Sequence, residues 1–427
     1  MRENERWILI MMDTIISGFG QAVVWVMMVF AVVGMICSLK SEEKGLGREW
    51  MLGLEQIGII SWSVCGFMTL LPYIEMLAEL VFTKYCGLFG VDPSVLASGF
   101  VSVDMGGYYL AKDLSTSNEV WIMATTSGYL LGPVFCFFIP IGLALFPKRD
   151  HKYFSLGLLA GIMSIPFGIF ITSALMKFFS PKLRPEISTN GASTMQLNYD
   201  WGTIIMNILP MAILCLVVAI GLFFKPDWVT KIFLWFANIL NVILKVAFVL
   251  SIIDYYTGFF SNVFGDAWQL QPILADEADQ FRGAELCFAV GLMLCGAYPM
   301  IACIQKVFAK PLERIGAKFG FTQLGATAIV GTLCNAMAFV RLFPELRPKD
   351  KVRGLAFAIC ASYVLADALS FTMNFQPNFF IFITLGKICG GIIGVIIVDL
   401  LIKKTVENYE RIDRETGVIG KDEYLAA

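Results

Sequence analysis

The sequence has few charged residues for its length. Only 15% of the 427 residues are Asp, Glu, Lys or Arg, whereas 57% are hydrophobic, and the mean hydropathy is +0.73. An average soluble domain has about 25% charged and about 45–50% apolar residues. One or two soluble cores could not bury this much apolar side chain, so the composition excludes a soluble protein and predicts a polytopic membrane protein.

The residues that build common catalytic and metal sites are also scarce. The single histidine, His151, lies in a charged run, which argues against histidine-rich zinc sites and Ser-His-Asp triads. The eleven cysteines form no C-x-x-C pair, and no G-x-x-x-x-G-K-[ST] run offers a phosphate-binding loop for an ATP-driven pump. A net charge of −2 gives no basic patch for nucleic acid. We therefore expect no catalytic residues, no cofactor, no metal and no nucleic-acid partner.

Long apolar runs predict the fold class. A transmembrane helix needs about 20 mostly apolar residues. Runs of this kind predict an all-α polytopic protein with about nine full transmembrane helices, near residues 14–38, 54–81, 119–147, 153–179, 203–224, 228–260, 284–308, 351–374 and 378–403.

Two further stretches, residues 93–114 and 322–346, differ from these runs. Each has a short apolar half, a small or polar break, and a second half that carries charge. Broken backbone at membrane depth is tolerated only where protein or water satisfies its polar groups. We therefore predict that both stretches are re-entrant hairpins.

The distribution of Lys and Arg predicts the orientation of the two hairpins. The loops at 40–48, 148–152 and 225–231 are basic, which places them in the cytoplasm by the positive-inside rule. Both flanks of the second hairpin are also strongly basic, as expected if it returns to the side it came from. The first hairpin has only two flanking lysines. It should therefore open from outside and the second hairpin from inside.

Opposite orientations of similar stretches indicate an inverted repeat. We predict a first repeat at residues 1–180 and a second at 228–404. Residues 181–227 would form an extracellular loop and a connecting helix, and residues 405–427 a cytoplasmic tail. Inverted repeats with discontinuous helices recur in secondary transporters, which bind substrate near the bilayer midplane. The arrangement favours a transporter of a small solute; a membrane sensor or scaffold and an intramembrane enzyme are the alternatives.

The break of the first hairpin holds the strongest candidate for substrate binding. Asp104 lies there, and a charge at membrane depth is costly enough to suggest a function. Gly106 and Gly107 would let a ligand approach closely, and Tyr108 and Tyr109 would add aromatic faces. A carboxylate beside aromatic rings suits an ammonium ion. The alternative role for Asp104 is to cap the half-helix that follows it.

Three other polar residues fall within the predicted membrane region. Asp367 and Lys387 could form a mutual ion pair that compensates both charges, or Asp367 could be a second anionic or proton-carrying group in the site. Asn335, in the second hairpin, could bind a substrate hydroxyl or satisfy the hairpin backbone.

Small residues recur every fourth position in the last predicted span, at Gly386, Gly390 and Gly394. Such a stripe allows two helices to pack closely. The partner helix could belong to the same protomer or to a second copy, so a homodimer is one possibility.

The run Asp-Met-Gly-Gly-Tyr-Tyr-Leu-Ala-Lys-Asp-Leu at 104–114 resembles a motif of the ethanolamine utilisation transporter family, EutH. Residues 158–162 with Ile165-Pro166, and the run 351–372 that contains Asp367, are also similar to that family. The resemblance implies a permease of the bacterial inner membrane whose substrate is ethanolamine, a small ammonium alcohol.

The resemblance is imperfect at the second motif. The family motif has Asp-His after Gly, whereas this sequence reads Ala366-Asp367-Ala368-Leu369. The missing histidine removes a polar group that could contact substrate or move a proton. It leaves room for a bulkier ammonium such as choline, and it weakens the expectation of proton coupling.

Overall fold

The computed structural model describes residues 3–139, 142, 145–277, 279, 282–334 and 336–420. The described chain is mostly helical, and its strands are the short antiparallel pair β1 (Lys182–Leu183) and β2 (Met195–Gln196). This confirms the predicted all-α polytopic class. The α-helices are α1 (Glu3–Ser38), α2 (Gly45–Ala78), α3 (Lys84–Gly87), α4 (Ser94–Ala97), α5 (Gly107–Leu114), α6 (Asn118–Leu130), α8 (His151–Phe179), α9 (Trp201–Phe224), α10 (Pro226–Thr257), α11 (Phe259–Phe264), α12 (Gly283–Lys318), α13 (Gln323–Cys334), α14 (Ala336–Leu342), α15 (Pro348–Ala361), α16 (Asp367–Phe375), α17 (Phe380–Ile397) and α18 (Lys403–Glu415).

Several short π- and 3₁₀-helical turns extend or join these helices. The π-helical turns are η1 (Glu79–Thr83), η4 (Val134–Phe138) and η9 (Val398–Ile402), and the 3₁₀ turns are η2 (Ser98–Phe100), η3 (Val103–Met105), η5 (Lys148–Asp150), η6 (Gly265–Ala267), η7 (Phe343–Glu345) and η8 (Pro377–Phe379).

Within the described ranges, eight helical segments are long and apolar enough to cross a membrane. They are Gly18–Ser38, Gly45–Gly87, Asn118–Phe138, Lys148–Phe179, Trp201–Gly221, Asn238–Thr257, Gly283–Ile304 and Pro377–Glu415. Each overlaps one of the predicted spans. The ninth predicted span, 351–374, is instead divided into α15 and α16 by five non-helical residues, 362–366. Hydropathy could not reveal this break, because those residues are as apolar as the helices on either side.

Short helices make up both stretches predicted as hairpins, and the described residues show a break in the first. In the first, α4 and η2 lead to the non-helical residues 101 and 102, and η3 and α5 follow. In the second, α13 precedes α14 and η7; residue 335, between them, lies outside the described residues. The inverted relation between the two halves of the chain stays a prediction.

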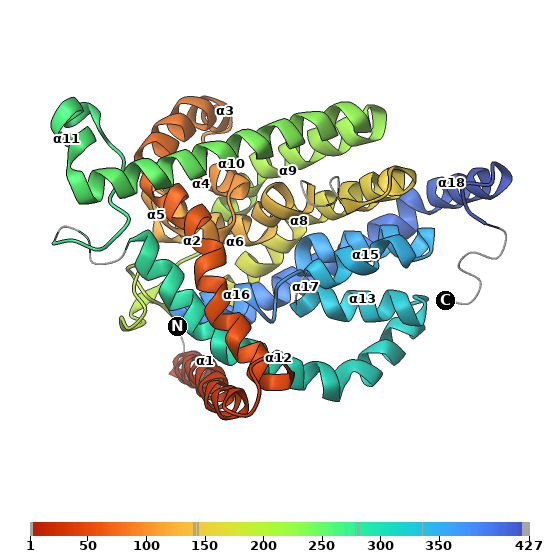
Figure 1. The fold of residues 1–427 in the computed structure, drawn as a ribbon, viewed down its shortest axis with the longest axis horizontal. Coiled ribbons are helices and arrows are strands. Elements are labelled where there is room, and N and C mark those ends of the chain that lie inside the picture. The colour runs from red at the N-terminus through yellow and green to blue at the C-terminus, as the bar shows by residue number, and fades with distance from the viewer. Residues whose placement is uncertain are drawn as a thin grey trace.

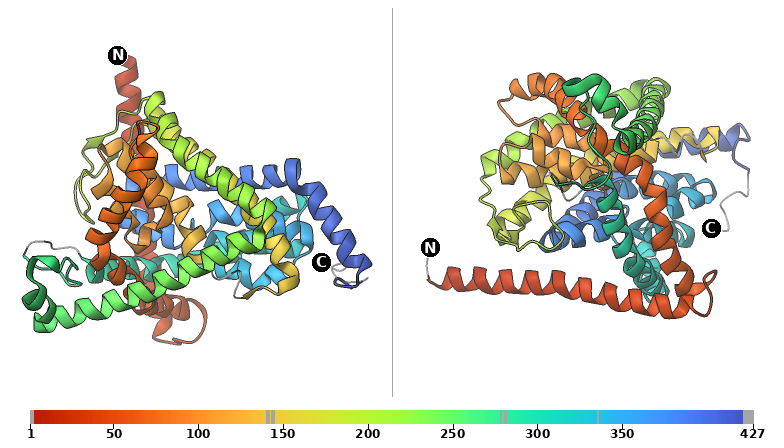
Figure 2. Two further views of the ribbon diagram at one scale, coloured as in Figure 1. Left: turned by 90° about the horizontal axis from the view of Figure 1, so that it is seen from above. Right: turned by 60° about the vertical axis from the view of Figure 1, so that its left-hand side comes forward.

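The helices that surround the breaks pack as one bundle. Helix α2 packs on α12, and α17 packs on α8 and α15. Figure 1 shows α8, α13, α15 and α17 together in one half of the molecule, with α9 and α10 beside them. Helix α1 lies along one edge, and its N-terminal half extends beyond the other helices (Figure 2).

The glycine stripe of α17 faces the inside of this bundle. A Cβ atom on Gly386 would lie 1.9 Å from Oγ1 of Thr172 on α8, and one on Gly394 would lie 2.6 Å from the carbonyl oxygen of Ala356 on α15. Helices can approach this closely only where side chains are missing. The stripe therefore serves packing within the protomer, which leaves α17 firmly held beside the helix breaks.

Candidate functional site

The first helix break depends on two glycines. Gly106 has a φ of 96°, and a Cβ atom there would lie 2.2 Å from Cδ1 of Phe67. A Cβ atom on Gly107 would lie 2.7 Å from the carbonyl oxygen of Val101, while the Gly107 N–H donates to the carbonyl oxygen of Ser102 at 3.1 Å. Only glycine combines the left-handed conformation with such close contacts. The break is thus built into the local sequence.

Asp104 lies within this break, in η3. One of its carboxylate oxygens, Oδ1, accepts a hydrogen bond from Oγ of Ser102. The residue that precedes α5 is Gly106, and no side-chain hydrogen bond caps that helix. The capping role considered for Asp104 is therefore not observed, and its carboxylate lines a cavity instead.

The second break, at residues 362–366, is made without glycine. Tyr363 adopts a φ of 60°, which is uncommon for a bulky residue. Its N–H donates to the carbonyl oxygen of Thr332 at 3.1 Å, and the N–H of Leu365 donates to that of Leu333 at 2.8 Å. Both acceptors lie in α13, so a neighbouring helix satisfies the N–H groups of this break. Asp367 follows the break as the first residue of α16.

A third interruption follows α6 and involves Lys387. Pro133 has no N–H, so it cannot donate to the carbonyl oxygen of Tyr129, four residues earlier. The Nζ atom of Lys387, on α17, donates to that oxygen at 2.7 Å, and the lysine side chain is buried. The ion pairs in the described part of the chain include none between Lys387 and Asp367. The expected mutual pair is replaced by this bond to a backbone carbonyl.

The three interruptions meet around one cavity with an empty volume of about 360 Å³. It holds two carboxylates and one ammonium group, and aromatic rings from two of the broken segments form much of its remaining wall. Its lining residues are Ser102, Asp104, Tyr129, Pro133, Phe137, Tyr363, Asp367, Ala368, Phe371 and Lys387. We take this cavity, called the central cavity below, as the candidate functional site.

The comparisons with known proteins concern almost the whole chain. Residues 19–401 match the family model described as ethanolamine utilisation protein, EutH. The chain belongs to the EutH family. The probable ethanolamine permease EutH of Listeria monocytogenes is 27% identical over 404 residues, which cover 93% of this chain and 99% of that protein. The protein of the same name in Salmonella typhimurium is 26% identical, with 91% and 96% of the two chains covered. No solved structure matches.

A third relative carries no functional name. The uncharacterized protein YxeR of Bacillus subtilis is 24% identical over 374 residues, which cover 87% of this chain and 92% of that protein. Together with the membrane-spanning helices, these relatives make this EutH-family member a multi-pass bacterial membrane protein.

The structure of this EutH-family member brings some of the predicted site residues together and separates others. Asp104, Asp367 and Lys387 all line the central cavity, although they are far apart in sequence. Gly106 and Gly107 shape the break beside Asp104 without lining the cavity. Asn335 lies outside the described residues.

The two predicted tyrosines lie elsewhere. The hydroxyl of Tyr108 accepts a hydrogen bond from Nε2 of Gln376 at 3.0 Å, and its ring packs against those of Trp121 and Phe371. Tyr109 lines a second, outer cavity. Neither ring lines the central cavity, so the aromatic wall predicted for Asp104 comes from other residues.

Sequence reasoning missed Tyr129 and Tyr363, which supply that wall. The hydroxyl groups of Tyr129 and Thr372 are hydrogen-bonded at 2.7 Å, which joins α6 to α16. The ring of Tyr363 packs against Phe137, with ring centres 5.9 Å apart. The sequence did hold one signal for Tyr129. It lies four residues before Pro133 in an apolar run, and a proline leaves the carbonyl oxygen of the fourth residue before it without a helical donor. No local signal marked Tyr363.

A wider cavity opens beside the loop that leads into α12 and is also lined by Tyr109 and Asp113 of the first hairpin, which is predicted to open from the extracellular side. It has an empty volume of about 1060 Å³, and we call it the outer vestibule. Three acidic side chains and one arginine are prominent in its wall, which consists of Met68, Leu71, Pro72, Glu75, Tyr109, Asp113, Gln271, Pro272, Asp279 and Arg282.

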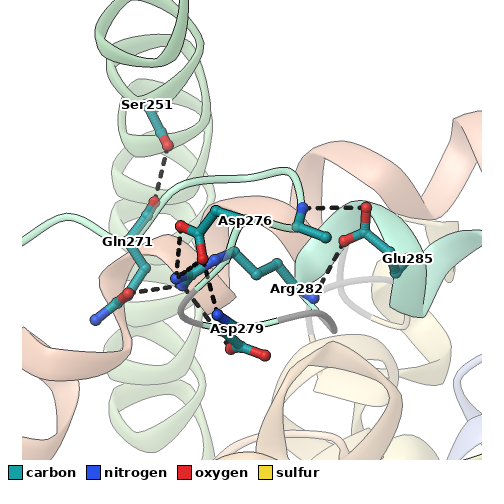
Figure 3. A network of polar contacts seen from close by, with 7 residues as sticks. Ser251, Gln271, Asp276, Asp279, Arg282 and Glu285 are labelled. Atoms are coloured by element: carbon teal, nitrogen blue, oxygen red, sulfur yellow. Dashed lines mark hydrogen bonds and ion pairs between the residues drawn. The ribbon is translucent and has the colours of Figure 1, made fainter. Parts of the chain in front are cut away.

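Arg282 organises the loop at the edge of the outer vestibule (Figure 3). Its guanidinium donates to Oε1 of Gln271 at 2.7 Å and forms an ion pair with Asp276 at 2.9 Å. Oγ of Ser251 on α10 donates to the carbonyl oxygen of Gln271 at 2.9 Å, and Glu285 on α12 accepts from the Arg282 N–H at 3.1 Å. These contacts fix the loop to both helices and account for Arg282 as a structural residue.

Proposed function

We propose that this protein is a transporter that imports ethanolamine by binding its ammonium group in the central cavity, between Asp104 and Asp367. The observation that carries the proposal is the meeting of two half-buried carboxylates and two tyrosines at three helix interruptions. Discontinuous helices surround the substrate sites of many secondary transporters. The names of the relatives, probable ethanolamine permeases, support the same assignment.

The chemistry of the central cavity suits a small primary ammonium ion. Carboxylate oxygens accept strong charge-assisted hydrogen bonds from ammonium N–H groups. Cation–π contacts with Tyr129 and Tyr363 would add about 0.5–2 kcal/mol. No catalytic step is needed for this function, and the protein is proposed to be a permease rather than an enzyme.

The outer vestibule supports the proposed direction of entry. Its acidic side chains, among them Glu75, Asp113 and Asp279, lie on the predicted extracellular side. In the described wall, these three carboxyl groups outnumber the one arginine, Arg282, and an excess of one sign of charge in a cleft raises the local concentration of the opposite ion. We propose that it gathers ammonium ions before they reach the central cavity.

One observation favours a second substrate, choline. Ala368 lines the central cavity at the position where the family motif led us to expect histidine. The small alanine leaves space for a trimethylammonium group, which has no N–H donors and would depend on the aromatic rings. Choline is therefore the alternative substrate.

Uptake into proteoliposomes tests the proposal. Vesicles that contain the full-length protein should accumulate labelled ethanolamine above the level of protein-free vesicles. Asp104→Asn should lower kcat/KM by about 100-fold, because truncation of one partner of a hydrogen-bonded charge pair in a complex costs about 2–5 kcal/mol. Asp200→Asn is the matched control: Asp200 caps α9 through the Thr203 N–H, and asparagine caps equally well.

The outcomes separate the candidate functions. Uptake no higher than in protein-free vesicles would contradict transport, and ethanolamine binding without uptake would favour a sensor. Wild-type kinetics in Asp104→Asn would contradict the assigned role of Asp104. Inhibition by an equal concentration of choline as strong as that by unlabelled ethanolamine would favour the second substrate.

A further inference from the structure

Lys387 is the only cation among the described residues that line the central cavity. Its side chain is 1% exposed, and its Nζ atom donates to the carbonyl oxygen of Tyr129 at 2.7 Å. A buried ammonium group is costly unless nearby charges and hydrogen bonds compensate it. The proposed transport function uses the two carboxylates and leaves this charge unexplained.

The position of Lys387 follows from the interruption after α6. Because Pro133 cannot donate to the Tyr129 carbonyl oxygen, that oxygen is free to accept from a side chain. The C-terminal end of a helix also favours a positive charge. The lysine is therefore anchored on a backbone oxygen rather than on a carboxylate.

This anchoring keeps the ammonium group of Lys387 from forming an ion pair with either carboxylate. In the described part of the chain, no ion pair joins Lys387 to Asp104 or Asp367. The ammonium group shares the cavity with both acids and offsets one negative charge, yet it does not occupy their oxygen atoms. An arriving ammonium ion can bind to the same oxygens.

We propose that Lys387 is a built-in cation that sets the net charge of the central cavity at −1, so that the site accepts one monovalent ammonium and rejects dications. This inference rests on the proposed transport function and assigns a specificity role that neither carboxylate can fill. With both carboxylates ionised, one bound monocation neutralises the cavity. A dication would leave a positive charge buried beside Lys387, where Coulomb repulsion is strong because the surroundings are poorly polarisable.

A purely structural role for Lys387 makes a different prediction. If the lysine serves only to satisfy the Tyr129 carbonyl oxygen, any side chain that keeps an N–H donor there should preserve substrate preference. Lys387→Gln keeps a donor and removes the charge. Lys387→Arg keeps both the donor and the charge.

Competition by a diamine distinguishes the two roles. The experiment measures uptake of labelled ethanolamine into proteoliposomes, with unlabelled ethanolamine or 1,3-diaminopropane as inhibitor near neutral pH, where the diamine is a dication. In the wild type, the diamine should inhibit at least about tenfold more weakly than ethanolamine. In Lys387→Gln, where the cavity carries two negative charges, the ratio of the two inhibition constants should shift by at least about tenfold toward the diamine.

A charge-restoring double variant completes the test. Lys387→Gln combined with Asp367→Asn returns the net charge to −1, so the preference for the monocation should return. Lys387→Arg should retain that preference. If the inhibition ratio is unchanged in Lys387→Gln, or the double variant fails to restore it, the proposed role of Lys387 is wrong while wild-type uptake still supports transport.

Two further outcomes are informative. Absence of uptake by the wild-type protein would contradict the proposed transport function itself. The wild-type measurement therefore tests transport separately from the role of Lys387. If Lys387→Gln does not yield a monodisperse protein, Asp367→Asn alone gives a neutral cavity and should raise the inhibition constant of ethanolamine at least about tenfold, with the diamine still rejected. Unchanged ethanolamine inhibition in that variant would overturn the proposal.

Discussion

The two helix breaks beside the central cavity each position one aspartate, but they are built in different ways. At the first break, Gly106 and Gly107 supply the left-handed turn and the close contacts, and Asp104 lies in the turn itself. At the second, Tyr363 takes the left-handed conformation, and the last turn of α13 accepts its N–H. Asp367 then begins the next helix.

This difference shows that the same feature can be encoded locally or through a distant segment. The first break needs nothing outside its own sequence except room beside Phe67. The second exists only when α13 is in place, because its backbone N–H groups would otherwise be buried without acceptors. The position of Asp367 therefore depends on the second hairpin, whereas the position of Asp104 depends on glycine.

The largest effect is expected from Gly106→Ala, which breaks the locally encoded turn. A Cβ atom there is strained by the positive φ and collides with Phe67, so we expect a loss of about 2–5 kcal/mol in stability and uptake near background. The shift of the thermal unfolding midpoint of the purified protein measures the loss of stability.

Gly90→Ala is the matched control for this collision. Gly90 has a φ of 65°, but a Cβ atom there would meet nothing within 4 Å. Gly90→Ala should lower the free energy of unfolding only by the backbone strain, about 1–2 kcal/mol. Equal midpoint shifts in the two variants would show that the contact with Phe67 does not shape the first break.

A smaller effect is expected from Tyr363→Asn at the second break. Asparagine tolerates the left-handed conformation, so the break should persist and the unfolding midpoint should fall less than in Gly106→Ala. Loss of the ring should weaken ethanolamine binding by up to about 30-fold, the equivalent of a cation–π contact of about 2 kcal/mol. Calorimetric titration measures the affinity.

Tyr363→Val distinguishes the effect of the backbone conformation from the effect of losing the aromatic ring. It removes the same ring but places a β-branched residue at positive φ, which is disfavoured. Its unfolding midpoint should lie below that of Tyr363→Asn. The reverse order would mean that the left-handed conformation at Tyr363 is unimportant for the second break.

The smallest effect is expected from Tyr129→Phe, which removes the hydrogen bond to Thr372 between α6 and α16. A hydrogen bond of this kind contributes about 1 kcal/mol. A double-mutant cycle with Thr372→Val should give a coupling of that size in the free energy of unfolding. Additive effects would show that this bond does not connect the two segments.

The sequence predicted the membrane class, eight of the spans and the first break, because each has a local signal. Apolar length marks the spans, and the two glycines after Asp104 mark the break. The interruption of the span 351–374 had no such signal, since its residues are ordinary helix formers and its partner lies in α13.

The structure places Tyr108 and Tyr109 outside the lining of the central cavity for a geometric reason. Tyr108 and Tyr109 follow Asp104 closely in sequence, but the left-handed turn at Gly106 separates η3 from α5, so residues on the two sides of it do not share a helix face. The rings that line the cavity come from other segments and belong to Tyr129, Phe137, Tyr363 and Phe371. Likewise, the bond between Lys387 and the Tyr129 carbonyl oxygen requires the tertiary fold, although Pro133 marks that oxygen as free.

Calorimetric titration of ethanolamine into four versions of the full-length protein tests the central claim most directly. The versions are the wild type, Asp104→Asn, Asp367→Asn and Glu75→Gln, the last of which alters only the outer vestibule. If the ammonium group binds in the central cavity, the first two variants lose at least about tenfold in affinity and Glu75→Gln stays within about twofold of the wild type. A large loss in Glu75→Gln, with wild-type affinity in Asp104→Asn and Asp367→Asn, would contradict the assignment of the central cavity.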